Sequence, residues 1–442
     1  MPDTDALKDR VRGAIDEQSE EIVSLAKSIQ DEPELGFKET ETTRKVIETF
    51  EEMGLDVEEP LAVTGARARI GSGDPVIAVL GELDALVNPE HPMADPETGA
   101  CHACGHHAQI ATMIGTAIAF ATTDVVDELD GRVEAMAVPA EEYLDLGYRR
   151  SLKDEGTIEF FGGKQELLRR GHFDDVDAAM MVHAADDTPE REVTARNSTN
   201  GFVGKFVTYT GKTSHAGGAP DEGVNALNAA VMGMNGIHAA RERFRDEDAV
   251  RVHPIMTRGG DGVNVVPSEV TMESYTRAKT IEAIDEANDD VNAALEAGAM
   301  AVGARVEIDD EPGYMPLRTN DAMVDAYEAN AADLLGDDAI VTDSPHLTGS
   351  TDMGDVSQVV PSLHPWGGGF EGNVHQEDFA VADEEMAYVT QAKILAGTIV
   401  DLLADPEAIE AIRAAKDEKK SREEYLEDVR TFQDRVVGDY LD

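Results

Sequence analysis

The spacing of apolar and polar positions changes along the chain and predicts its elements. In residues 5–30 and 39–54 the apolar positions follow the spacing of amphipathic helices. Three short apolar runs, at residues 75–83, 132–139 and 176–182, are typical of buried strands, and helical patterns separate them. Strands that alternate with helices predict an α/β domain whose mixed, largely parallel sheet is flanked by helices.

In the middle of the chain the apolar and polar positions alternate over longer stretches, which predicts longer strands. The expected order is strand, helix, two strands, helix and strand, at residues 202–210, 221–245, 251–258, 263–278, 281–302 and 304–310. This β-α-β-β-α-β order is that of a ferredoxin-like unit. We therefore expect an α+β domain at residues 195–312, inserted into an α/β domain formed by residues 1–194 and 313–442. Residues 405–442 are charged and are expected to form a helical surface segment of the α/β domain.

The strong negative charge of the chain argues against anionic binding partners. Its 442 residues include 90 aspartates and glutamates against 37 lysines and arginines, a formal net charge of −53. Such a surface repels phosphate backbones and anionic lipids, so we expect neither nucleic acid nor a membrane as partner. No apolar run has the length of a membrane span and the N-terminus lacks a signal-peptide core, so a soluble cytoplasmic protein is expected.

The distribution of the acidic residues suggests why the chain carries so many. They are spread between apolar periodic segments, which argues against an acidic disordered protein. Arginine also outnumbers lysine, and the composition resembles that of halophilic archaeal proteins. In a salt-rich cytoplasm a carboxylate surface stays hydrated while salt screens its self-repulsion.

Both cysteines lie in ACHACGHHAQ, residues 100–109, which could be a redox pair, a haem attachment or a metal site. Haem attachment requires a histidine directly after the second cysteine, where this chain has Gly105. A thioredoxin-like role for the C-x-x-C spacing lacks a surrounding thioredoxin-type unit. Cys104 and His106 flank Gly105 at a strand-to-helix junction, where both side chains can reach one cavity. A thiolate and an imidazole suit zinc, although manganese, cobalt and nickel can use such sites.

Further candidate ligands follow the expected strands. Asp84 follows the first apolar run, Glu141 and Glu142 follow the second, and His183 follows the third. Because sites in open α/β sheets form beyond the carboxyl ends of strands, we expect these side chains to converge. One of the paired glutamates can bind a metal ion while the other takes a proton from water.

Each of these signals also has a plainer explanation. Adjacent carboxylates in so acidic a chain are usually solvated, and a lone histidine at a strand end is more often structural. His375 lies in a glycine-rich loop, GGGFEGNVHQEDF, whose backbone freedom lets a distant segment reach the site. Together these cysteine, histidine and glutamate side chains offer enough ligands for two metal ions.

An ordered set of motifs extends from DEPELGF at residues 31–37 to the helix after His375. The motifs are GELDAL (81–86), HACGHH (102–107), VPAEE (138–142), GGKQELLRRGHFDDVDAAMMVHA (162–184), GKTSHAGGAP (211–220), GGDGVNVVP (259–267), GSTDMGDVS (349–357) and GNVHQEDF (372–379). On these motifs the chain resembles the zinc metallopeptidase family of aminoacylases, carboxypeptidase G and auxin-conjugate amidohydrolases. GSTDMGDVS and HACGH resemble its aminobenzoyl-glutamate hydrolase and β-alanyl-lysine dipeptidase branch. The family's fold is a catalytic α/β domain with an inserted ferredoxin-like lid used for dimerisation.

The resemblance implies a role for each candidate residue of the α/β domain. The implied ligands of two divalent metal ions, zinc or else manganese, cobalt or nickel, are Cys104, His106, Glu142, His183 and His375. Glu141 matches the general base, and Asp84 matches an acid that orients a metal-binding group.

In the lid, the resemblance points to three more residues. His215 matches a histidine that reaches the partner's active site in family dimers and stabilises the oxyanion, so a homodimer is expected. Asn264 and Arg277 match positions linked to substrate, and an arginine there can clasp a carboxylate through two hydrogen bonds. His215 could equally be a loop histidine, and Arg277 could be a salt-bridge partner on an acidic lid.

The implied activity is hydrolysis of an amide bond in N-acyl- or aryl-amino acids, of which aminobenzoyl-glutamate is an example. The small-molecule substrate would carry a carboxylate, and Glu141 would move the proton from the attacking water to the leaving amine. A dipeptidase or carboxypeptidase acting on small peptides, such as β-alanyl dipeptides, is the alternative. A non-catalytic metal-binding scaffold is a third, although neither the base nor a ligand is missing from the sequence.

Two features depart from the family pattern. His107 follows the C-G-H motif where relatives often carry aspartate or asparagine, so it is either a third imidazole near the site or a change in the pocket alone. Residues 143–161 separate the paired glutamates from GGKQELL by more than many relatives show. This stretch contains Arg149, Arg150 and Lys153 and is either a surface loop or a substrate-facing insertion.

The acidic composition predicts that salt stabilises the fold. We expect the melting temperature, followed by circular dichroism, to rise as potassium chloride increases from about 0.1 M to about 2 M, because the screening length falls to ~3 Å at about 1 M. A non-ionic osmolyte serves as the control, since it does not screen charge. A protein that is most stable without salt would contradict this expectation.

Overall fold

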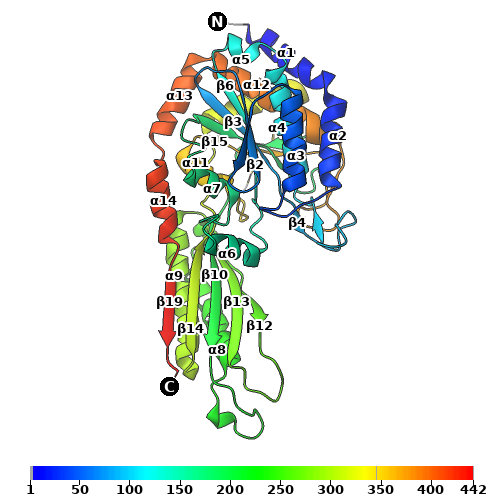
Figure 1. Cartoon of the computed structure of the whole chain (residues 1–442). Coiled ribbons are helices and arrows are strands. Elements are labelled where there is room, and N and C mark those ends of the chain that lie inside the picture. Colours follow the sequence, from blue (N-terminus) through cyan, green and yellow to red (C-terminus); the bar gives the residue numbers. More distant parts are fainter. Residues whose placement is uncertain (1–2, 345, 442) are drawn as a thin grey trace. The chain divides into compact units, whose positions relative to one another are not determined.

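The structure is a computed structural model that describes residues 3–344 and 346–441 (Figure 1). The chain forms two compact units, and each is described by itself. The first comprises Met1–Ser198, Arg318–His346 and Asp355–Arg422, and the second comprises Thr199–Leu317, Leu347–Gly354 and Glu423–Asp442. Each unit has a hydrophobic core of its own.

A mixed six-stranded sheet forms the centre of the first unit. Its strand order is β1-β2-β6-β3-β7-β15, at Val57–Leu61, Gly65–Ile70, Arg132–Val138, Val76–Glu82, Ala178–Met180 and Ser362–Leu363. β3 runs parallel to β6 and β7, and β15 runs parallel to β7, whereas β1 and β2 pair antiparallel at one edge. All of β3 is buried, which explains its apolar sequence. The expected α/β fold with a mixed, largely parallel sheet is confirmed.

Helices flank this sheet. The main ones are α1 (Thr4–Glu17), α2 (Ser19–Gln30), α3 (Thr40–Glu52), α4 (His106–Ala121), α10 (Asp321–Leu335) and α12 (Gln391–Ala404). α4 packs against β3 and against α1, α2 and α12, so almost every one of its residues is buried. The stretch Glu385–Ala404 is long and apolar enough for a membrane span, but 89% of its most apolar window is buried, as in a core helix.

The second unit contains a sheet with helices on one face. Its strands, in the order β11-β13-β10-β14-β19 with β12 beside β13, are Arg251–Val252, Glu269–Ala278, Gly201–Thr210, Arg305–Pro312, Arg435–Asp439 and Ile255–Arg258. α8 (Ala226–Ala240) and α9 (Ile281–Val302) pack together on the face where Val207, Val270 and Ile308 are buried. Up to β14 the order is the expected β-α-β-β-α-β, except that the strand expected at residues 251–258 is divided into β11 and β12 and that β13 begins only at Glu269.

The end of the chain differs from the sequence-based expectation. Residues 405–442 were expected to be a helical segment of the α/β domain, and α13 (Pro406–Asp417) and α14 (Arg422–Thr431) are indeed helical. However, β19 pairs antiparallel with β14, and residues 423–442 group with the second unit, as do residues 347–354. Val436 and Tyr440 pack on the second core, so β19 covers an otherwise open edge of β14.

A buried ion pair stabilises the second unit between its sheet and α9. Lys205 Nζ of β10 lies 2.6 Å from Asp310 Oδ1 of β14, and both side chains are shielded from solvent. Asn288 and Asn292 of α9 donate hydrogen bonds to Asp310 Oδ2 at 2.7 and 2.9 Å. Burial lowers the pKa of Lys205, and Asp310 opposes that shift. Every charge in this group therefore has a partner, which buried charges require.

Removing one member of this pair should destabilise the protein strongly. We expect Lys205→Met to lower the free energy of unfolding by about 3–5 kcal/mol, because it leaves the Asp310 carboxylate buried and unpaired. Urea titration at constant salt measures this change. The matched double variant Lys205→Met/Asp310→Leu should recover much of the loss, and a double variant no more stable than the single one would contradict the explanation.

Candidate active site

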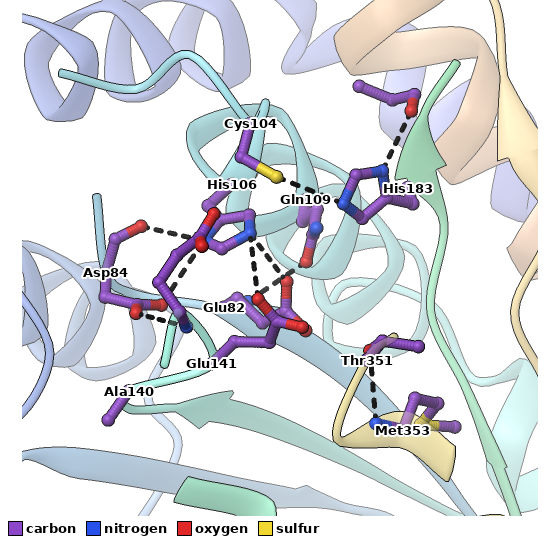
Figure 2. Close-up of polar contacts among 12 residues, drawn as sticks. Glu82, Asp84, Cys104, His106, Gln109, Ala140, Glu141, His183, Thr351 and Met353 are labelled. Carbon is purple, nitrogen blue, oxygen red and sulfur yellow. Dashed lines mark hydrogen bonds and ion pairs between the residues drawn. The ribbon is translucent and has the colours of Figure 1, made fainter. Parts of the chain in front are cut away.

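Side chains at the carboxyl ends of the first unit's strands gather in one buried cluster (Figure 2). Glu82 ends β3, and Asp84 follows two residues later. Glu141 lies three residues after β6, and His183 begins the short strand β8 (His183–Ala184) that follows β7. These neighbouring strands thus deliver their next residues to the same edge of the sheet.

The turn that leads into α4 adds a thiol and an imidazole. Gly105 has a φ of +82°, and a Cβ there would come 2.6 Å from the Cβ of Ala184. Only glycine therefore suits both the backbone conformation and the space at this position. It allows Cys104 and His106 to lie on either side of the turn, with Cys104 Sγ 3.4 Å from His183 Nε2.

Acidic groups hold the His106 ring from both sides (Figure 2). Its Nδ1 lies 2.8 Å from the backbone oxygen of Asp84 and 3.2 Å from Asp84 Oδ1, while its Nε2 lies 3.0 Å from Glu82 Oε2. Glu82 Oε1 in turn pairs with Lys164 Nζ at 2.5 Å, with both side chains fully buried. Burial raises the pKa of Glu82, but Lys164 and His106 outweigh it and hold that pKa well below its usual value.

The five candidate ligands form two overlapping groups. Cys104, His106 and His183 make up one group, and Cys104, Glu142 and His375 make up the other. Within each group the ligand atoms lie within 4.8 Å of one another. His375 is half-exposed, and its Nε2 lies 3.2 Å from Glu142 Oε1. Cys104 is common to both groups, so its sulfur lies between them.

The donor atoms of this cluster fit divalent metal ions. Glu82 Oε2, Asp84 Oδ1, His106 Nε2 and Glu142 Oε1 are buried and have no partner in hydrogen-bond geometry among the described residues. Such atoms are costly to bury unless a ligand or ion satisfies them. A thiolate with imidazoles and carboxylates is a donor set that transition metals of the zinc type prefer.

The ionisation of the cluster also suits metal binding. Burial by itself raises the pKa of the Cys104 thiol, but His183 and His106 outweigh it and lower this pKa to about 6. Burial likewise raises the pKa of Glu142, whereas the neighbouring His375 lowers it, to about 2. At neutral pH the cluster therefore holds a thiolate and a carboxylate, which are forms that ligate metals. Burial lowers the pKa values of His106, His183 and His375, but the acidic groups of the cluster outweigh it and raise them, so metal binding would release protons from these imidazoles.

Buried acids also fix the backbone on both sides of Glu141, whose side chain is only 10% exposed. Glu39 Oε1 accepts a hydrogen bond from the Ala140 N–H at 2.8 Å, and Asp84 Oδ2 accepts one from the Glu142 N–H at 2.9 Å. These contacts hold Ala140 at a φ of +55°, which non-glycine residues rarely adopt. Burial, together with Asp84, raises the pKa of Glu39 to about 7.

The sequence-based candidates did not include Glu82, Lys164 or Glu39. Glu82 carried a usable signal, because it is an acidic residue at the end of an apolar run and two positions before Asp84. Lys164 lies in the GGKQELL segment, which carried the family resemblance but no residue role, and Glu39 had no local pattern that would mark it.

The other three candidates belong to the second unit. His215 follows β10, and its Nδ1 accepts hydrogen bonds from two downstream backbone N–H groups at 3.1 and 2.9 Å, which leaves Nε2 to carry the proton of a neutral ring. Asn264 is exposed and its carbonyl accepts the N–H of Ala216, so it lies beside His215. Arg277 lies on β13, with Nη1 3.4 Å from Ser350 Oγ.

Arg277 also lines an open cavity of about 850 Å³ within the second unit. Arg241, Arg251 and His253 line the same cavity, together with one acid, Glu273. Arg251 lies directly opposite Arg277 in the antiparallel pairing of β11 with β13. A cationic cavity is unusual in a chain whose net charge is −53.

Other residues of the opening motif lie outside the two ligand groups. Cys101 and Cys104 are both free thiols, and Cys101 is fully buried. His107 is buried in α4 beside Tyr388, with ring centroids 5.8 Å apart, and burial lowers its pKa to about 3. His107 therefore lies outside both ligand groups, with its ring buried beside that of Tyr388.

Comparison with known proteins places the whole arrangement in one family. Residues 78–401, more than half of the chain, match the model described as Peptidase family M20/M25/M40. A human protein named Xaa-Arg dipeptidase is 29% identical over 456 residues, covering 95% of this chain and 94% of its own.

Solved structures show the same fold. A dinuclear metal-binding M20 peptidase from Bacillus subtilis has a TM-score of 0.66 and 24% identity, covering 87% of this chain and 98% of its own. An aminobenzoyl-glutamate utilization protein from Klebsiella pneumoniae has a TM-score of 0.63 and 18% identity, covering 88% and 97%. The expected kinship is confirmed: the chain belongs to Peptidase family M20/M25/M40 and is a metal-dependent hydrolase of amide bonds.

Proposed function

We propose that the protein hydrolyses the amide bond of N-acyl- or aryl-amino acids that carry a carboxylate, with aminobenzoyl-glutamate as the representative substrate. The observation that carries this proposal is a pair of ligand groups that share Cys104 beside the buried carboxylate of Glu141. A non-catalytic scaffold would not need such a carboxylate among the ligands. The acidic surface is consistent with a salt-rich cytoplasm as the place of action.

Two divalent metal ions are proposed as cofactors. Cys104, His106 and His183 would hold one ion, and Cys104, Glu142 and His375 the other, with Asp84 orienting His106 through its Nδ1. The thiolate favours zinc, and manganese, cobalt and nickel are the alternatives. When bound, the ions supply Lewis-acid activation of the amide carbonyl and of water.

Glu141 is the proposed general base. Its carboxylate takes a proton from the attacking water and then passes it to the leaving amine nitrogen. The fixed backbone on either side keeps this carboxylate in one orientation, which proton transfer at hydrogen-bond distance requires. Glu142, one residue later, is fixed by the same contacts, and so the two acids can take separate roles.

His215 is the proposed donor to the oxyanion. Because its Nδ1 already accepts two backbone hydrogen bonds, the ring presents Nε2–H as a donor while neutral. We propose that this histidine serves the active site of a second copy in a homodimer formed through the second unit, and that Asn264 beside it contacts substrate.

The cavity of the second unit supports an acidic amino acid as the recognised part of the substrate. Arg241 and Arg251 donate to the backbone carbonyls of Val252 and Val250, and neither pairs with a carboxylate among the described residues. Arg251 lies directly opposite Arg277 in the sheet, so two guanidinium groups line the same cavity. A glutamate product with two carboxylates is complementary to this cavity, which Arg241, Arg251 and Arg277 line against one acid.

A dipeptidase acting on small peptides such as β-alanyl dipeptides is the second candidate. Glu273 is the acid that lines the same cavity, and it could receive a cationic amine. Assays with aminobenzoyl-glutamate, β-alanyl-lysine and N-acetyl amino acids, in high salt with zinc, manganese or cobalt, separate the two candidates.

Replacing the proposed base should abolish turnover without removing metal. We expect Glu141→Gln to lower kcat by about 100- to 10,000-fold, because a general base contributes a factor of that size. Metal content, measured by atomic absorption, should stay at the wild-type level. Glu52→Gln, at an exposed position of α3, is the matched control. Near-normal turnover by Glu141→Gln would refute the assignment.

Neutralising the cavity should change substrate preference. Arg251→Gln should lower kcat/KM for aminobenzoyl-glutamate by roughly 10- to 100-fold, the value of a hydrogen bond to a charged group, and should affect N-acetyl-leucine less. Arg258→Gln is the control. Arg258 ends the neighbouring strand β12, and its guanidinium already pairs with the carboxylates of Asp261 and Glu269. Equal losses for both substrates would contradict recognition of a second carboxylate.

A further inference from the structure

Residues 143–161 form a compact insertion built around one buried arginine. The insertion contains α6, Leu146–Asp154, and Arg149 on this helix is only 1% exposed. Among residues 3–344 and 346–441 the structure records no carboxylate partner for it, although the chain is rich in acids. A buried arginine without an acid must find its hydrogen bonds elsewhere, since an unsatisfied charge is costly to bury.

The Arg149 guanidinium donates to three backbone carbonyls. Its Nη1 bonds the oxygen of Phe161 at 2.6 Å and that of Ala140 at 3.4 Å, and its Nη2 bonds the oxygen of Glu142. Phe161 and Glu142 stand at the two ends of the insertion, so Arg149 closes it into a loop. Ala140 and Glu142 are also the residues on either side of Glu141.

The segment before α3 is shaped to receive this guanidinium. A Cβ on Gly36 would clash with Arg149 Nη2 and would come 3.0 Å from the Cα of Ala140. The Phe37 ring centroid lies 5.4 Å from the guanidinium carbon, within the range of a cation–π contact. Gly36 and Phe37 thus enclose the arginine against the turn that carries the paired glutamates.

We propose that Arg149 is a positioning residue that locks the Ala140–Glu142 turn and so sets the directions of the Glu141 and Glu142 side chains. Ala140 adopts a positive φ, which is unfavourable for a residue with a Cβ and needs support from outside. Glu39 holds the Ala140 N–H from one side, and Arg149 holds the Ala140 and Glu142 carbonyls from the other.

The side chain chemistry explains why this position needs arginine. A guanidinium is planar, always charged and carries five N–H donors in a fixed fork, so it can bond carbonyls that diverge. A lysine ammonium at the same place is a point charge and cannot span the same three oxygens with fixed geometry. The insertion therefore supports the site through a contact that a conservative substitution does not reproduce.

This inference rests on the proposed roles of Glu141 and Glu142 and predicts an effect on only one ligand group. Loss of the Arg149 contacts disturbs Glu142, which belongs to the group with Cys104 and His375, and leaves the group of Cys104, His106 and His183 in place. The second of two bound ions should therefore be affected, and the first should not.

Cobalt titration of the metal-free protein tests this prediction. We expect wild type to bind two Co²⁺ ions, and Arg149→Ala to bind one normally and the other about 10- to 100-fold more weakly, the usual effect of losing a group that orients a ligand. The thiolate-to-cobalt absorption band of Cys104 and the number of Co²⁺ ions bound per chain report the binding of the first and of the second ion. In addition, kcat should fall by about 10- to 100-fold while KM changes less.

Two further variants keep the test decisive. Arg149→Lys should resemble Arg149→Ala in metal binding and carries the test if the alanine variant does not fold. Arg150→Ala, on the same helix, should behave as wild type. Free guanidinium ion at low millimolar concentration should restore the second cobalt site of Arg149→Ala.

The outcomes separate this inference from the proposed function. Wild-type affinity for both ions in Arg149→Ala, equal weakening of both ions, or no rescue by guanidinium would each overturn the positioning role. Full turnover by Glu141→Gln would instead overturn the proposed function, whatever the cobalt titration of the Arg149 variants gives.

Discussion

Burial of charge at the carboxyl edge of the first unit's sheet is the constraint on which the site depends. Glu82, Asp84, Glu142 and Cys104 bring acidic groups into a space almost closed to solvent. An uncompensated buried charge costs several kcal/mol, so each needs a cation, a donor or a metal ion within reach. Lys164 and the ligand imidazoles supply part of this compensation. Glu82 Oε2, Asp84 Oδ1 and Glu142 Oε1 lie within 3.0–3.2 Å of imidazole nitrogens but outside hydrogen-bond geometry, so the pairing of charges inside the cluster is incomplete and a metal ion would complete it.

The fold could be predicted from the sequence where local patterns carried the information. Apolar runs at β3, β6 and β7 are long enough to mark buried strands, and the alternation in β10 and β13 marks a sheet with one covered face. β19 could not be predicted in this way. It has five residues, follows a charged helix, and becomes a strand because β14, more than a hundred residues earlier, offers an edge.

The residues of the candidate site also divide into those that a local sequence pattern marks and those that depend on distant contacts. Cys104, His106, Glu142 and His183 are recognisable because each follows a strand or begins a helix, and strand ends in α/β sheets collect functional groups. Glu39 and Arg149 act on the same turn through hydrogen bonds to its backbone, and no local pattern marks such partners. Arg149 is harder still to recognise, because a cation in an insertion is usually at the surface.

The sulfur of Cys104 has a thermodynamic consequence for the two proposed metal positions. Because one atom belongs to both candidate ligand groups, occupancy of either position would change the charge and orientation of a ligand of the other. Binding at two positions that share a ligand is linked, and linkage is reciprocal: whatever the first ion does to the affinity of the second, the second does to the first. The mononuclear and dinuclear forms would then be separate states of the enzyme, with populations set by the supply of metal.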